Sequence, residues 1–145
     1  MRGSAGVASI VSLLGIVAAC SSPLQVPSGS NSGPTVTFSA LPVLSGSAAG
    51  VPETKIDGGV GQVTLQGAIG TELSCATVSG TAAVSGKRLD FTVTASQTEG
   101  CDAPADTFAY HGTVGNLTAR TLDVFLIHVH PSAVDTVLSR TVTVR

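Results

Sequence analysis

Apolar and polar side chains alternate strictly between residues 88 and 97, and this alternation constrains the fold more than any other feature of the sequence. The apolar members are Leu89, Phe91, Val93 and Ala95, and the polar members are Asp90, Thr92, Thr94 and Ser96. Because successive side chains of a β-strand point to opposite faces of a sheet, the pattern predicts a strand with one buried and one solvated face. No stretch shows a convincing helical period, so we expect an all-β chain.

Similar alternation recurs from Thr35 to the end of the chain and predicts about seven strands. The predicted strands are centred on residues 36–40, 63–69, 78–84, 89–96, 108–114, 122–129 and 138–144. Ser85-Gly86-Lys87 is predicted to be a turn between two of them. Short strands with regular turn signals indicate a single antiparallel β-sandwich over residues 35–145, with a small β-barrel as the alternative.

The composition limits what this domain is expected to bind. The formal net charge is −2 and only 11% of residues are charged, which leaves no basic surface for nucleic acid. The chain has no Trp, one Tyr and four Phe, so its core must consist mainly of small aliphatic groups. We find no nucleophile motif and no cofactor motif, and we therefore expect a non-catalytic protein without a cofactor.

The N-terminus has the pattern of an export signal. Arg2 precedes an apolar run over residues 7–19, and these 13 residues are fewer than the roughly 20 that span a bilayer. The run ends in Val17-Ala18-Ala19-Cys20-Ser21, which resembles the lipobox of bacterial lipoproteins. The resemblance implies that residues 1–19 are a signal peptide, that Cys20 receives a diacylglyceryl group, and that its new amino group is often acylated as well. The alternative is ordinary cleavage after Ala19, which would leave Cys20 as a free residue.

The same resemblance implies a location. A lipid on Cys20 would anchor the chain to the membrane of the cell envelope. Because Ser21 rather than Asp follows the cysteine, the lipoprotein rule favours the outer membrane, facing the periplasm or the surface, if the host has two membranes. Residues 20–34 are rich in Ser, Gly and Pro and are predicted to be a flexible linker with a reach of roughly 20 Å.

The number of cysteines is consistent with lipidation of Cys20. The chain has three cysteines, and an odd number in an exported protein needs an explanation. Lipidation of Cys20 leaves Cys75 and Cys101 to form a disulfide in an oxidising compartment. The closed loop of about 26 residues would stabilise the domain by about 3.5 kcal/mol in the chain-entropy treatment.

The C-terminal half resembles the closing strands of immunoglobulin-like sandwiches. The resemblance is carried by Phe108-x-Tyr110, Leu117 and Leu122-x-Val124-x-Leu126-x-His128. The cysteine pair at residues 75 and 101 also resembles that of small Ig-like domains of bacterial surface proteins. These likenesses imply an Ig-like topology and a binding or structural role.

His128-Val129-His130 is a candidate metal-binding motif. Side chains two apart on a strand point the same way, so both imidazoles could reach one cation. His-x-His pairs on strands ligate metals in carbonic anhydrases and copper-zinc superoxide dismutases, but those sites need further ligands. Only His111 remains here, and it is predicted on the face opposite Tyr110. The alternative is that the two histidines simply end a strand that Pro131 breaks.

The strand over residues 122–129 is apolar on both faces. Leu122, Val124 and Leu126 form one face, while Phe125, Ile127 and Val129 form the other. If the first set enters the core, the second faces outward as a possible surface for a protein partner or a second copy, unless the linker or Val43-Leu44 covers it. We therefore expect a lipid-anchored envelope protein with a binding or structural role, the alternative being a periplasmic metal-binding protein that uses His128 and His130.

Overall fold

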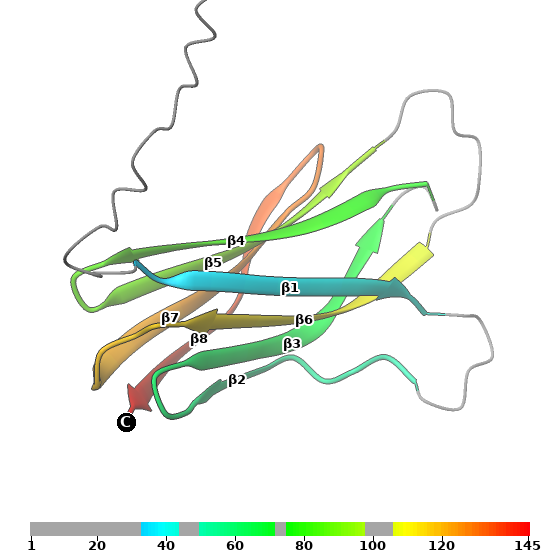
Figure 1. Ribbon diagram of the computed structural model, residues 1–145. Helices are drawn as coiled ribbons and strands as arrows, with labels where there is room; N and C mark the ends of the chain where they lie inside the picture. The colour runs from blue at the N-terminus through cyan, green and yellow to red at the C-terminus, as the bar shows by residue number, and fades with distance from the viewer. Residues whose placement is uncertain (1–32, 44–49, 72–74, 98–105) are drawn as a thin grey trace, which may run out of the picture. The chain divides into compact units, whose positions relative to one another are not determined.

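The computed structural model describes residues 33–43, 50–71, 75–97 and 106–145, and they form two four-stranded β-sheets packed as a sandwich (Figure 1). The first sheet has the order β1 (Thr35–Pro42), β6 (Asp106–Gly115), β3 (Val63–Thr71), β2 (Lys55–Gly58). The second has the order β4 (Thr77–Ser85), β5 (Arg88–Ser96), β7 (Arg120–Val129), β8 (Val134–Val144). The predicted all-β sandwich is confirmed, and over the described residues the two sheets stay open rather than closing into a barrel.

One strand pair departs from the antiparallel arrangement that we expected. β5 and β7 run parallel, whereas the other neighbouring strands are antiparallel. Parallel neighbours need a crossover connection, and here β6, which belongs to the facing sheet, is the return strand between them. Period-2 alternation reports which face of a strand is buried but carries no information on strand direction, so this pairing could not be predicted.

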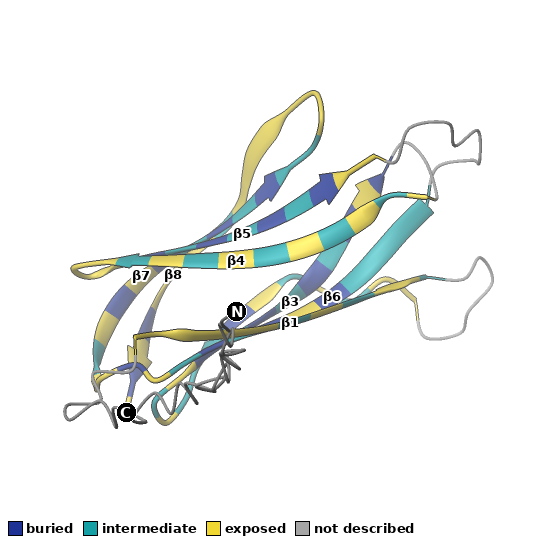
Figure 2. Ribbon diagram, turned by 45° about the horizontal axis from the view of Figure 1, so that its top comes forward, coloured by how far each residue is buried: buried dark blue, intermediate teal, exposed yellow. Residues whose placement is uncertain are grey.

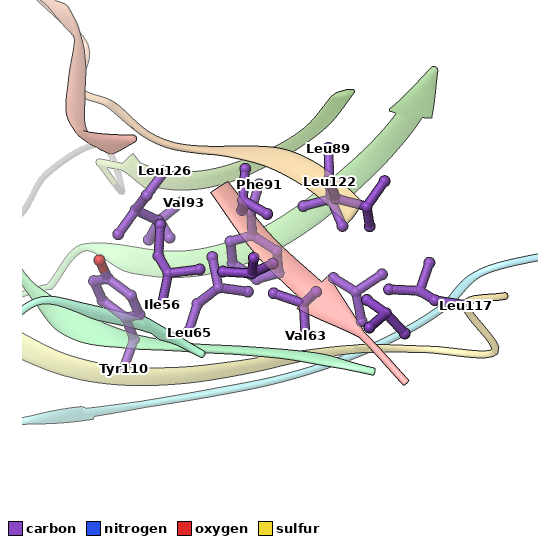
Figure 3. Close-up of a cluster of buried hydrophobic side chains, with 14 of the residues drawn as sticks. Ile56, Val63, Leu65, Leu89, Phe91, Val93, Tyr110, Leu117, Leu122 and Leu126 are labelled. Carbon is purple, nitrogen blue, oxygen red and sulfur yellow. The ribbon is translucent and has the colours of Figure 1, made fainter. Parts of the chain in front are cut away.

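The alternation does place the core correctly. Buried and exposed or half-buried residues alternate along β3, β5 and β7, and Figure 2 shows this as bands along the strands. Leu89, Phe91 and Val93 on β5 are fully buried, as predicted. Figure 3 shows their side chains meeting those of the facing sheet. The predicted inner face of β7 is also confirmed, because Leu122, Val124 and Leu126 are fully buried.

The hairpin between β4 and β5 follows the predicted turn. Ser85 pairs with Arg88, so that Gly86 and Lys87 form a two-residue loop. Gly86 has a φ of 57°, in the left-handed region that glycine adopts with little strain.

Two features of the strand set were missed. β2 was not predicted because its single core residue, fully buried Ile56, stands between charged Lys55 and Asp57. β8 begins at Val134, whereas we predicted a strand from Leu138. The first four residues of β8 are all exposed and therefore show no alternation.

Aromatic rings pack directly on glycines, and this compensates for the scarcity of large side chains. The Phe91 ring of β5 lies on Gly112 of β6, and the Phe38 ring of β1 lies on Gly80 of β4, so both contacts join the two sheets. In each case a Cβ on the glycine would overlap the ring. Glycine at these positions therefore permits the sheets to approach each other closely.

This packing predicts that Gly112→Ala destabilises the fold by about 1–3 kcal/mol, because the new methyl group must displace the buried Phe91 ring. Gly70→Ala on β3 is a matched control, since nothing lies within 4 Å of a Cβ built there. It should change the free energy of unfolding by no more than about 0.5 kcal/mol. Urea denaturation of both variants tests this, and equal midpoints would contradict it.

Candidate functional site

A hydrogen bond between two buried side chains connects the sheets through the core. The hydroxyl of Tyr110 on β6 lies 2.8 Å from Nε2 of His128 on β7. Tyr110 is 3% exposed and His128 is 6% exposed. Figure 3 shows the Tyr110 hydroxyl directed away from β6 toward the other sheet. The His128–Tyr110 pair is therefore a polar link between the two sheets inside a mainly apolar interior.

Local sequence explains how the pair is positioned. His128 continues the alternation of β7, because it lies on the same inner face as Val124 and Leu126. Tyr110 pairs across to β3 with Gly67, where a Cβ would lie only 2.6 Å from the tyrosine hydroxyl oxygen. The glycine thus leaves the space over β3 in which the tyrosine ring lies.

The histidines predicted as metal ligands are not brought together as a metal site. His128 uses Nε2 for Tyr110, and His130 lies just beyond the end of β7 with its ring centroid 6.2 Å from that of His128. His111 is exposed on the outer face of β6, as predicted. Across the described ranges, no three or more His, Cys, Asp or Glu residues are grouped in a way that could hold a metal ion. β7 ends at Val129, directly before His130-Pro131, and metal binding by His128 and His130 stays a prediction.

The environment of the pair favours its uncharged form. Burial lowers the pKa of His128, and the nearby His130 lowers it further, while Asp135 on β8 acts in the opposite direction. Burial also raises the pKa of Tyr110 above its ordinary value. A neutral imidazole and a neutral phenol form one hydrogen bond in either tautomer of the histidine. The Tyr110 hydroxyl donates to Nε2 of His128 when Nε2 carries no proton, and Nε2–H donates to the tyrosine oxygen when it does. Protonation of His128 would leave the tyrosine oxygen only an accepting role and would place a charge in the core.

The lowered pKa of His128 predicts a pH-dependent stability. In the unfolded chain histidine titrates near about pH 6.5, so below that pH the unfolded state binds more protons than the folded state. The contribution of neutral, buried His128 to the free energy of unfolding is fully present above about pH 6.5. It is lost as the pH falls toward the lower pKa of folded His128. The melting temperature of the wild type should therefore decline as the pH drops below about 6.5.

His128→Gln should remove most of this decline, because glutamine can still bond Tyr110 but does not titrate. His111→Gln is the matched control and should leave the decline in place, since His111 is exposed on the outer face of β6. Thermal unfolding followed by circular dichroism between about pH 5 and 8 measures both slopes. A wild-type slope that persists in His128→Gln would show that another group causes the pH dependence.

The outer face of β7 is the second candidate region. Phe125, Ile127 and Val129 point away from the core, as predicted, and all three are half-buried. Phe125 is covered by the chain itself, because the Arg88 guanidinium carbon lies 4.1 Å from its ring centroid. Asp90 holds Arg88 there through two hydrogen bonds of 2.8 and 2.9 Å. Ile127 and Val129 lie farther along the same face and are half-buried.

The neighbouring strands extend this apolar region. Val129 pairs with Thr94 on β5 and with Val134 on β8, and Val134 is 68% exposed. We call Ile127, Val129 and Val134 the outer apolar patch. Beside it, a shallow groove of about 460 Å³ is lined by Thr94–Gln97 and by Val129–Pro131. Val134 could not be predicted as part of this surface, because the sequence pattern of β8 does not show the strand pairing that places it beside Val129.

Several predicted residues lie outside the described part of the chain. These include Cys20, Cys101, Leu44 and the linker before Gly33. Val43 is described, and its N–H donates to the Thr107 carbonyl of the first sheet, so Val43 does not cover the outer apolar patch of the second sheet. Cys75 lies two residues before β4. The lipidation and disulfide assignments therefore stay predictions.

Comparison with known proteins adds no assignment. No protein-family model matches the chain, and no curated protein or solved structure matches it significantly. Within the part of the chain that the structure covers, no helix has the length and apolarity needed to cross a membrane.

Proposed function

We propose that this chain is a lipid-anchored protein of the bacterial cell envelope whose sandwich binds another envelope protein through the outer face of the second sheet. The main evidence for a binding role is the outer apolar patch on β7 and β8. Ile127 and Val129 have only threonines and Val134 as register partners on the adjoining strands, so no charge lies directly across from them. Fully covering side chains of this size stabilises an association by about 1.5–3 kcal/mol each, less the part already buried.

The surroundings of the patch support a protein partner. Thr92 and Thr94 adjoin it on β5. Farther along the same face the outward residues become charged, with Arg88 and Asp90 on β5 and Asp123 on β7. An apolar centre with a polar rim on one side is the usual layout of a protein–protein interface.

This role predicts that Ile127→Asp keeps the fold but weakens the association strongly, because it places a charge in the middle of the patch. Thr121→Asp is the matched control on the same face of β7, outside the patch, and should bind normally. Cross-linking in intact envelopes, followed by quantification of the partner bound to each variant, measures the effect. Circular dichroism must show both variants folded.

Two outcomes would contradict the binding role. If Ile127→Asp unfolds, Ile127 belongs to the core and the patch is not a surface. If the folded variant retains the partner as well as Thr121→Asp does, the partner binds elsewhere.

The lipid anchor is proposed from the lipobox resemblance around Cys20. The disulfide is proposed because lipidation of Cys20 leaves two cysteines, Cys75 and Cys101, to pair. The strand register is compatible with the disulfide. Thr77 at the start of β4 pairs with Ser96 at the end of β5, so Cys75 and the connection that contains Cys101 both adjoin the same end of this hairpin. A bridge between these two cysteines would join the beginning of β4 to the β5–β6 connection.

Cys20→Ser should abolish incorporation of labelled fatty acid, because the acceptor thiol is lost. Cys75→Ser is the control and should incorporate the label normally per mole of chain, since its thiol is not part of the lipobox. Labelling in growing cells, normalised to the amount of each chain, measures this. Equal labelling of the wild type and Cys20→Ser would refute the lipid anchor.

A further inference from the structure

The two sides of the sandwich differ in how their edge strands are protected. β2 and β8 lie along one side and carry Lys55, Asp57, Asp135 and Arg140. Arg140 donates to the Ile56 carbonyl at 2.9 Å and lies 3.7 Å from Asp57, which ties these edges together. A register irregularity between β7 and β8 further interrupts that edge. Charges and bulges are the usual devices that prevent an edge strand from pairing with another chain.

The described strands of the opposite side carry neither charges nor bulges. β1 and β4 lie beside each other there, joined by the contact of Phe38 with Gly80 (Figure 1). Neither strand contains a charged residue, and β4 contains no proline. The register of β4 with β5 is regular over nine residues. Among the described strands none pairs with β4 on its outer side, so its backbone groups are available to another strand.

The sequence of β4 is self-complementary about its central residue. We propose that β4 pairs antiparallel with β4 of a second copy of this chain, with Thr81 opposite Thr81. The remaining pairs across the interface would be Thr77 with Ser85, Val78 with Val84, Ser79 with Ala83, and Gly80 with Ala82. Small residues thus meet at every position, with Val78 opposite Val84 on the inner face and Thr77 opposite Ser85 on the outer face.

The faces of the strand agree with this register. A two-fold axis perpendicular to the sheet keeps inward side chains inward, and it requires that a residue lie opposite itself. Val78, Ala82 and Val84 point inward and are only half-buried in one copy. The proposed pairing would bury them further against the same residues of the second copy.

The pairing also limits the assembly to two chains. It would join the second sheets of the two copies into one eight-stranded sheet whose outer edges are both β8. Those edges carry the charges and the irregularity described above, so growth would stop there. β1 lies on the same side in the first sheet and is also uncharged, which extends the uncharged contact area to both layers.

Disulfide trapping in the full-length chain tests the register. Thr81→Cys should give a disulfide-linked dimer under mild oxidation, because the two sulfurs would face each other at the two-fold axis. Ser79→Cys alone and Ala83→Cys alone should not, since each would lie opposite the other position. A mixture of these two variants should again give a dimer. No dimer from Thr81→Cys, or equal trapping at all three positions alone, would overturn the proposed pairing.

A charge at the axis provides an independent test without new cysteines. Thr81→Lys should reduce the dimer fraction of the purified full-length chain at least several-fold in sedimentation velocity, because two like charges would lie side by side. Thr143→Lys makes the same change at an exposed, outward position of β8 and should leave the dimer intact. A wild type that is monomeric throughout the micromolar range, or a Thr81→Lys variant that dimerises normally while folded, would refute the proposal. Loss of the envelope partner in Ile127→Asp is a separate readout and does not affect this outcome.

Discussion

The packing of aromatic rings on glycine backbone is the constraint on which the rest of this structure depends. A chain with no Trp and few other aromatic residues cannot fill a wide gap between two sheets. Phe91 on Gly112 and Phe38 on Gly80 instead let the sheets come close, so that small aliphatic groups complete the core. The rings also form a continuous row: Phe38 lies 6.3 Å from Phe91 and 6.1 Å from Tyr110, and Tyr110 lies 5.5 Å from His128, measured between ring centroids. The polar His128–Tyr110 pair belongs to this row, which continues to His130 at 6.2 Å from His128.

The sequence predicted those parts of the structure that depend on which face of a strand is buried. The inner faces of β3 and β5 follow directly from alternation, because a single misplaced register would expose every apolar residue of the strand. β7 is apolar on both faces, so alternation separates its two sets of residues but does not say which set is buried. Alternation correctly placed His111 opposite Tyr110, whereas the outward position of Ile127 was expected from the likeness of this strand to those of Ig-like sandwiches. It did not find β2, since one buried residue between two charged ones makes no repeating pattern.

Pairing between distant strands was beyond prediction, and the candidate site depends on it. His128 was judged by its spacing from His130, whereas its real partner is Tyr110, 18 residues away on the facing sheet. Tyr110 was expected on the face opposite His111, but nothing in a single sequence indicates which residue the tyrosine meets across the core. Likewise, Val134 joins the outer apolar patch only because β8 pairs with β7 in one particular register.

Symmetry and tethering fit together if both proposals hold. A two-fold axis perpendicular to the second sheet leaves the outer faces of both copies pointing the same way, so the dimer would present two outer apolar patches on one surface. The described chain enters each sandwich through β1, which belongs to the first sheet, on the other side of the core. Antiparallel pairing puts the two entry points at opposite ends of the dimer. A separate linker of roughly 20 Å reach would connect each entry point to its lipid anchor. Two tethers and two patches per assembly would strengthen attachment to a partner that is itself repeated in the envelope, because the second contact forms at a high effective concentration.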